Sequence, residues 1–369
     1  MLNKRFGSIS KKFFSRKIEI IRGNANRNTK SADVELRGVK LNSNYQDNPN
    51  MIFFVDYFDK PENWLTFFLK NRTLDHRNVY ILNTPNFGNS DHTNERDLEA
   101  LEGKNLAEAV ERFMWQNKIS TATLAGHGFG ARLAFLMGCY NPEQVTGIAA
   151  IDYVPHNYSK FDVASRLRNA LKSLNQITES MRKGEMNRKQ INQHIEDNLE
   201  HPKMQALFKQ NVKHVKNSVF EWEFNMDLLA SHFDKTIDFK TQYGLYTGRV
   251  NFLFPDVSDY VFLNSHTNAM KKIAISCGNY NEDIITEFCH NDEPYLNHFI
   301  YEDKALTESF SFKLNRFLQC YDGVDVLLKN RRDVYERTFV PTRIHDRKDK
   351  LATDHFPNHF HHNWKVRAE

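Results

Sequence analysis

One short segment of the chain has residue types and spacing suited to covalent chemistry. Gly126, Gly128 and Gly130 alternate with His127 and Phe129, after a strand-like run and before an apolar helix-like run. A strand, a G-x-x-x-G turn and a helix place the central residue at the tip of a sharp turn, where a serine attacks a carbonyl group. The central residue here is Gly128, which relaxes the turn but has no side chain with which to form an acyl intermediate.

The runs around this segment predict an α/β fold. Strand-like and helix-like runs alternate at the spacing typical of βαβ units and a mostly parallel sheet. The strand-like runs are residues 51–55, 79–82, 121–125, 145–151, 250–254 and 284–288, and the helix-like runs are residues 97–115, 131–140 and 306–318.

Composition and periodicity divide the chain into three parts, the second of which contains an insertion. Residues 1–33 form a basic N-terminal extension, and residues 34–320 form the α/β domain. Within that domain, residues 157–234 are highly charged and predict a helical insertion without strands. Residues 321–369 are polar, with few periodic apolar positions, and form a C-terminal extension.

Further motifs occur in the same order as in one known family. Residues 86–90 (NFGNS) resemble an N-H-G-D-S turn, and residues 151–155 (IDYVP) contain a D-x-x-P pattern. Residues 220–228 (FEWEFNMDL) resemble an F-x-W-x-x-N-x-x-L lid motif, and residues 297–299 (NHF) resemble a G-H-x base site. With the G-x-x-x-G turn, the chain resembles an α/β-hydrolase, nearest the mitochondrial abhydrolase and bacterial esterase branch. The resemblance implies that fold, with the helical insertion as its lid.

Two departures from the family pattern fall on catalytic positions. Gly128 stands where the nucleophilic serine is found, and Asp56-Tyr57 stands where an HG dipeptide helps to bind the oxyanion. A carboxylate there opposes a developing negative charge, and loss of the nucleophile alone lowers turnover by about 10⁶-fold in a serine protease. We therefore predict a pseudoenzyme, in which Gly128→Ser folds but recovers little activity while Asp56 remains.

The resemblance assigns the remaining triad positions to Asp152, as orienting acid, and His298, as general base. Asp256 is the other candidate acid. Without a serine proton to move, Asp152 and His298 are expected to persist as a buried hydrogen-bonded pair.

Three other residues near this site have side chains that can take part in catalysis, but none is favoured. Ser90 and Cys139 are the nearest substitute nucleophiles, but Ser90 has no assigned base and Cys139 falls on an apolar helix, where a buried thiol is inert. His127 belongs to the inherited turn pattern and has no predicted role of its own.

Charge is distributed unevenly along the 369 residues, whose net charge is +4. Residues 1–30 carry nine Lys and Arg and one acid, whereas the residues between 30 and 330 carry a net −7. An acidic core disfavours nucleic-acid binding through the domain. The first 22 residues are basic, amphipathic and rich in serine, which is typical of a mitochondrial presequence and predicts a location in the matrix or on the matrix side of the inner membrane. No apolar run has the length of a membrane span, so we expect none.

The C-terminal extension interleaves histidines with aromatic residues: His355, Phe356, His359, Phe360, His361, His362 and Trp364. Paired histidines can bind Zn²⁺, but an aromatic arm that anchors on a partner is the favoured interpretation. We therefore predict no metal. There is also no Walker loop or dinucleotide-binding motif, so we predict no cofactor.

Three functions remain open at the level of sequence. The favoured one is a catalytically inactive accessory subunit of a mitochondrial assembly, with the respiratory chain as first candidate host, attached through both extensions to other protein subunits. The alternatives are a protein that binds a lipid, acyl chain or small ligand in the vestigial pocket, and an active esterase or thioesterase with a displaced nucleophile.

Overall fold

The computed structural model describes residues 17–21, 27–30, 33–43, 48–70, 74, 76–94, 97–239, 246, 248–255, 284–289, 301 and 307–318. In chain order the first elements are β1 (Ile18–Ile21), β2 (Arg27–Thr29), β3 (Gly38–Leu41), β4 (Asn50–Phe54), α2 (Pro61–Lys70), β5 (Asn78–Leu82), β6 (His92–Thr93), η3 (Leu98–Leu101), α3 (Gly103–Gln116), β7 (Ala122–His127), η4 (Gly128–Gly130), α4 (Ala131–Tyr140), η5 (Pro142–Gln144) and β8 (Val145–Ile151). The remaining elements are α5 (Asp162–Asn175), α6 (Thr178–Lys183), α7 (Arg188–Asn198), α8 (Pro202–Gln210), β9 (Val212–Lys216), β10 (Val219–Trp222), α9 (Met226–Ile237), β11 (Val250–Pro255), β12 (Ile284–Cys289) and a helix over residues 307–318.

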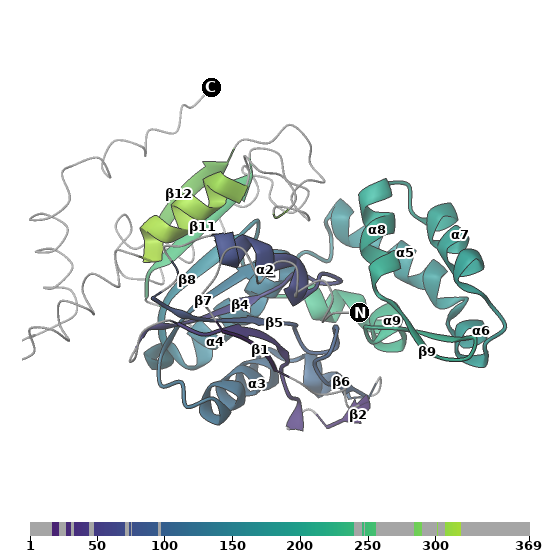
Figure 1. The fold of residues 1–369 in the computed structure, drawn as a ribbon, viewed down its shortest axis with the longest axis horizontal. Helices are drawn as coiled ribbons and strands as arrows, with labels where there is room; N and C mark the ends of the chain where they lie inside the picture. The colour runs from purple at the N-terminus through teal and green to yellow at the C-terminus, as the bar shows by residue number, and fades with distance from the viewer. Residues whose placement is uncertain are drawn as a thin grey trace, which may run out of the picture. The chain divides into compact units, whose positions relative to one another are not determined.

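The centre of the fold is an eight-stranded sheet in the order β1-β3-β5-β4-β7-β8-β11-β12 (Figure 1). The six strands from β5 to β12 are mutually parallel, whereas β3 is antiparallel to both β1 and β5. All six residues of β7 are buried, as expected of a central parallel strand covered on both faces. The predicted α/β class and the mostly parallel sheet are confirmed.

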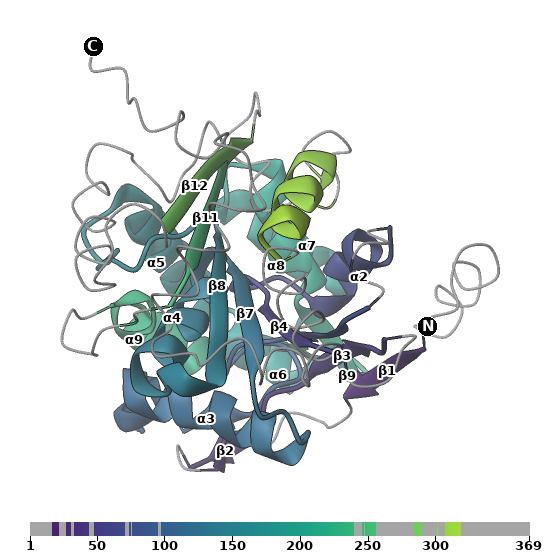
Figure 2. The same cartoon turned by 90° about the vertical axis from the view of Figure 1, so that its left-hand side faces the viewer.

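Helices cover both faces of this sheet. Figure 2 shows α3 and α4 on one side of the strands and α2 with the helix of residues 307–318 on the other. Helix α4 packs on β7 and β8, and α2 packs on β3 and β5. Ala131, Leu133, Ala134, Phe135 and Leu136 of α4 are all buried, so this helix belongs to the core.

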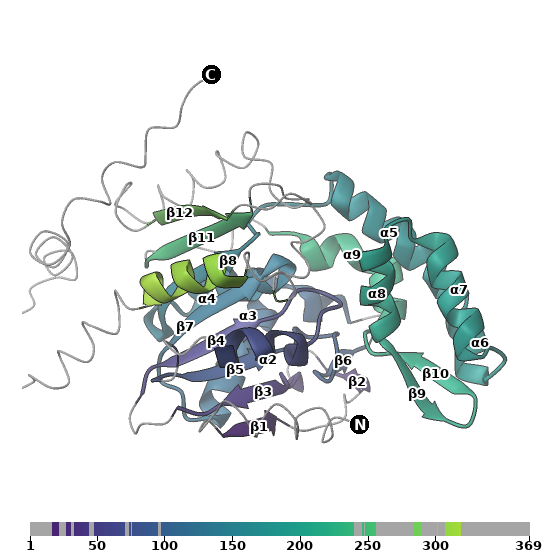
Figure 3. The same cartoon turned by 45° about the horizontal axis from the view of Figure 1, so that its top comes forward.

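The insertion after β8 consists of α5 to α9, as Figure 3 shows. The prediction that it lacks strands is wrong, because β9 and β10 form an antiparallel hairpin within it. Four consecutive residues of β9, Lys213 to Lys216, are exposed, so no alternation of apolar and polar residues marks the strand. Asn217 makes the turn with φ of 47°, a left-handed conformation that asparagine tolerates.

The sheet also begins earlier than the expected start of the domain at residue 34. Strand β1 pairs with β3 from Ile18 to Ile21, inside the segment predicted as an N-terminal extension. Its isoleucines are half-buried or exposed, and Glu19 of the strand forms an ion pair of 2.7 Å with Lys17, the residue before it begins. The strand was not predicted because its segment is basic. Charged residues are nevertheless common on the edge strands of sheets.

Candidate functional site

The G-x-x-x-G segment forms the sharp turn that its sequence predicts. Strand β7 runs through His127 into η4, and α4 starts at Ala131. A Cβ atom on Gly126 would lie 2.5 Å from the Cα atom of Ala131, and one on Gly130 would lie 2.3 Å from the carbonyl oxygen of Val55. The outer glycines are therefore required by close backbone approach, and Gly128 sits at the tip with φ of +49°.

The carboxylate of Asp56 occupies the space directly in front of this tip. Asp56 follows β4 and is 2% exposed. Its Oδ1 atom accepts a hydrogen bond from the backbone N–H of Tyr57 and another from that of Phe129, each 2.8 Å long. A Cβ atom on Gly128 would lie 2.4 Å from the Cγ atom of Asp56, so the carboxylate fills the position that a side chain at residue 128 requires.

The two N–H groups converge as the donors of an oxyanion hole do. In hydrolases with this turn, one donor is the residue after the nucleophile and the other comes from the loop after an earlier strand. Phe129 and Tyr57 stand in those two places. Both hydrogen bonds end on the Oδ1 atom of Asp56, so a side chain of the same chain occupies these donors.

The remaining predicted triad positions are only partly described. Asp152 follows β8, is fully buried and has φ of 53°, and its backbone N–H donates to the carbonyl oxygen of Leu253 over 2.8 Å. Burial raises the pKa of Tyr158, and the charges of Asp152 and Asp56 act in the same direction. His298 and Asp256 lie outside the described residues, so the predicted pairing of Asp152 with His298 stays a prediction.

The hydroxyl group of Ser90 is engaged in structural hydrogen bonds. Ser90 is fully buried, donates to the carbonyl oxygen of Asn83 over 3.0 Å and accepts from the backbone N–H of Arg37 over 2.9 Å. Arg37 also forms an ion pair of 2.6 Å with the buried carboxylate of Asp91. Ser90 therefore ties the turn after β5 to β3.

The side chains of Cys139 and His127 are surrounded by other residues. Burial raises the pKa of the Cys139 thiol to about 11, which keeps it protonated and unreactive near neutral pH. His127 is fully buried, and its ring centroid lies 5.2 Å from that of Trp64 in α2.

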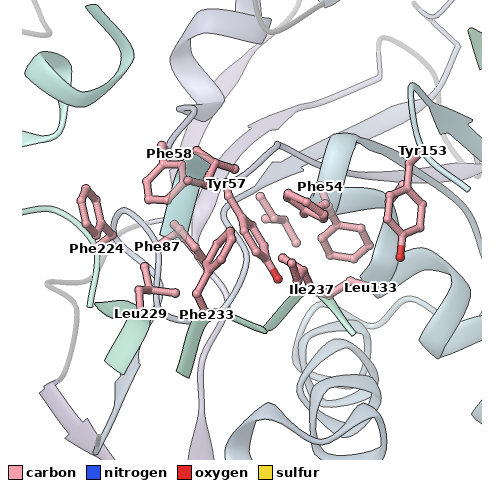
Figure 4. Packing of buried hydrophobic residues seen from close by; sticks show 14 of the residues in the cluster. Phe54, Tyr57, Phe58, Phe87, Leu133, Tyr153, Phe224, Leu229, Phe233 and Ile237 are labelled. Carbon is pink, nitrogen blue, oxygen red and sulfur yellow. The ribbon is translucent and has the colours of Figure 1, made fainter. Parts of the chain in front are cut away.

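Aromatic side chains fill the region in front of the turn. Tyr57 stacks on Phe87 with ring centroids 4.3 Å apart (Figure 4). The ring centroid of Tyr57 also lies 5.1 Å from that of Phe129. Phe58 stacks on Phe208 of α8 at 4.7 Å and meets Phe224 edge to face at 5.0 Å. Sequence reasoning missed this filling, although Phe129 and Phe87 lie inside the two turn motifs and were visible as aromatic residues there.

Hydrogen bonds fasten the insertion to the sheet around these rings. The hydroxyl of Tyr57 donates to the carbonyl oxygen of Thr236 in α9 over 2.6 Å, and burial raises the pKa of Tyr57. The side chain of Asn225 donates to Oδ1 of Asn86 over 3.0 Å and to the carbonyl oxygen of Thr93 over 2.7 Å. The insertion is thus held down by polar contacts as well as by aromatic packing.

A cavity of about 10 Å³ remains beside Tyr57, lined also by Thr84, Phe87, Arg132 and Thr236. This volume holds about one water molecule. Within the described ranges, no group of three or more His, Cys, Asp or Glu residues could hold a metal ion. The histidines near the C-terminus lie outside those ranges. No helix in the described part of the chain has the length and hydropathy of a membrane span.

Comparison with known proteins agrees with the fold. A family model described as alpha/beta hydrolase fold matches residues 55–214. The chain is 23% identical over 247 residues to the mouse sn-1-specific diacylglycerol lipase ABHD11, covering 66% of this chain and 78% of the lipase.

Solved structures give the same result. A marine microorganism esterase superposes with a TM-score of 0.62 at 17% identity, covering 77% of this chain and 99% of the esterase. A putative aryl esterase from Burkholderia cenocepacia superposes with a TM-score of 0.56 at 13% identity, covering 82% and 98%. From its sheet order, its strand–turn–helix segment and these likenesses, the chain has the α/β-hydrolase fold.

Proposed function

We propose that this chain is a catalytically inactive relative of the α/β-hydrolases that serves as an accessory subunit of a mitochondrial protein assembly. The main support for a loss of catalysis is that the Asp56 carboxylate accepts hydrogen bonds from the backbone N–H groups of Tyr57 and Phe129. A substrate carbonyl oxygen has no access to those donors while Asp56 holds them. Gly128 offers no nucleophile in front of them.

Packing around the turn supports the same proposal. Tyr57, Phe58 and Phe87 occupy the space under the insertion, and the adjoining cavity has room for about one water molecule. Aromatic filling in front of the turn favours a role of the protein surface over a role of the turn itself. The basic residues 1–22 and the aromatic residues within 330–369 support a mitochondrial location and attachment to partner subunits.

The assembly role is tested by the native mass of the chain in gently solubilised mitochondria, measured on a blue-native gel with an antibody against the chain. We expect it to migrate with a much larger complex, and the respiratory chain is the first host to compare, followed by ATP synthase and the mitochondrial ribosome. Migration near its own 43.4 kDa would contradict the proposal.

The loss of catalysis is tested separately with a fluorophosphonate probe, which labels activated serines. We expect no labelling of the folded, purified chain under conditions that fully label an active esterase of the same fold. A probe adduct mapped to any serine, and absent after heat denaturation, would show that the site is active.

A further inference from the structure

The backbone around Gly128 has kept two donors aimed at one point. The N–H groups of Tyr57 and Phe129 come from segments that are far apart in sequence, yet both end on the same Oδ1 atom at 2.8 Å. The Phe129 group also precedes the first turn of α4, the end of a helix that favours negative charge. Two convergent donors at such a place favour a negatively charged acceptor.

We propose that this turn is still an anion-binding site, that Asp56 is its built-in ligand, and that removing the Asp56 side chain opens the site to a small monocarboxylate. The inference rests on the proposed loss of catalysis, since a site that holds a side chain is closed to a substrate. It goes further by stating that negative charge, and not merely filled volume, is what the turn requires.

Burial and shape support this assignment. Asp56 is 2% exposed, and a buried carboxylate is tolerated only where hydrogen bonds replace its lost hydration. Without the carboxylate, the N–H groups of Tyr57 and Phe129 lose their hydrogen bonds to Oδ1 of Asp56, and the loss of buried hydrogen bonds is destabilising. Gly128 leaves the room in which the carboxylate sits. Acetate has the same heavy atoms as the side chain that Asp56→Gly deletes, so it fits both the space and the donors.

The first test measures thermal unfolding of the full chain and of Asp56→Gly in increasing sodium acetate, with sodium chloride at matched ionic strength. Asp56→Gly is expected to unfold at a lower temperature than the unsubstituted chain. Acetate is then expected to raise its unfolding temperature in a saturable manner, on the order of 3 °C, because a ligand that binds only the folded state stabilises it. The unsubstituted chain should show no such rise, since Asp56 already occupies the site.

The matched control is Asp33→Gly, which removes an exposed carboxylate with the same change in backbone freedom. Its unfolding temperature should not respond to acetate beyond the response to chloride. An equal response to both salts in Asp56→Gly, or an equal acetate response in all three proteins, would overturn the proposal.

A second variant tests the charge without opening the site. Asp56→Asn keeps the volume and one carbonyl oxygen for both donors but has no charge. Because hydrogen bonds to a charged acceptor are the stronger ones, we expect Asp56→Asn to unfold at a lower temperature than the unsubstituted chain and to ignore acetate. Equal unfolding temperatures would show that volume alone suffices. Neither measurement depends on the partner assembly, so failure here and failure of the native-mass test are separate results.

Discussion

The carboxylate of Asp56 occupies the space that a side chain at residue 128 would need, so the two positions are sterically coupled. A Cβ atom at residue 128 would lie 2.4 Å from Oδ1 of Asp56, far inside normal contact distance. Asp56 cannot simply swing away, because its Oδ1 atom is bound by the N–H groups of Tyr57 and Phe129. We therefore expect Gly128→Ser to fold, as the sequence predicts, but with lower stability than the unsubstituted chain.

Gly128→Ser alone is expected to lower the free energy of unfolding by about 1–3 kcal/mol, as overpacking of a filled site does. The double variant Asp56→Gly/Gly128→Ser should be destabilised by less than the sum of its single variants, with a coupling of about 1 kcal/mol or more. Urea unfolding of the four proteins measures this. Strict additivity would contradict the contact, and Gly128→Ser with Asp33→Gly provides the additive control pair.

Asp59 is a second buried carboxylate in the same loop, bound by side chains. Its Oδ1 atom accepts from Asn63 over 2.7 Å and from the hydroxyl of Tyr301 over 3.1 Å, and its Oδ2 atom accepts from the indole N–H of Trp64 over 2.8 Å. Burial nevertheless raises its pKa to about 6, because the desolvation of the charge outweighs these bonds.

A raised carboxyl pKa makes the folded state bind more protons than the unfolded state between about pH 4 and pH 6. The contribution of Asp59 to stability is therefore highest below pH 4 and is lost as pH rises through 6. We expect the unfolding temperature of Asp59→Asn, relative to the unsubstituted chain, to rise between pH 4.5 and pH 7.5. A difference that stays constant over this range, or that falls, would exclude the raised pKa.

At the scale of elements, hydrogen bonds from the side chain of Asn225 connect the insertion to the sheet, in addition to aromatic packing. Asn225 is the N-cap of α9, and the same side chain donates to Asn86 and to the carbonyl oxygen of Thr93. Phe87 and Phe224 also form an isolated antiparallel bridge beside it. The start of α9 is thus tied to the turn after β5.

Asn225→Ala is expected to lower the free energy of unfolding by about 1–3 kcal/mol, since it removes a helix cap and the hydrogen bonds to Asn86 and Thr93. Hydrogen exchange should accelerate both in α9 and in the turn of residues 86–93. Asn187→Ala is the matched control, because Asn187 caps α7 through a capping box with Gln190 and is exposed. Its effect should stay within α7. Acceleration confined to α9 in Asn225→Ala would show that the two segments are not coupled.

The sequence predicted those elements whose residues are uniformly buried. The strands β4, β7, β8 and β11 read as apolar runs because both faces are covered, and their positions were predicted to within about two residues. Strand β9 was missed because Lys213 to Lys216 are exposed on both faces. The role of Asp56 as occupant of the turn was not predictable either, because it depends on the meeting of two segments that are 73 residues apart.

At the scale of the whole molecule, the two extensions carry the proposed attachment to partners. The C-terminal extension combines three aromatic residues with four histidines between residues 355 and 364. If the extension is an aromatic arm, assembly depends on its aromatic residues. If it is a metal site, assembly depends on its histidines. The segment can therefore be tested without deleting it.

We expect a chain lacking residues 330–369 to keep its unfolding temperature and to leave the large complex on a native gel. Within the full chain, replacing Phe356, Phe360 and Trp364 by serine should have the same effect, because aromatic anchors supply most of the energy of such contacts. Replacing His355, His359, His361 and His362 by asparagine should leave assembly intact. Loss of assembly in the histidine variant alone would favour a metal-dependent arm.

The contact between Asp56 and residue 128 also constrains the order in which mutations could place a serine at this turn. If serine appears first at residue 128, it meets the carboxylate at 2.4 Å, and if Asp56 is lost first, the N–H groups of Tyr57 and Phe129 are left without that acceptor. Each single step lowers stability before any activity can reward it. The two positions are therefore expected to be epistatic, because a change at either one is favourable only after a change at the other.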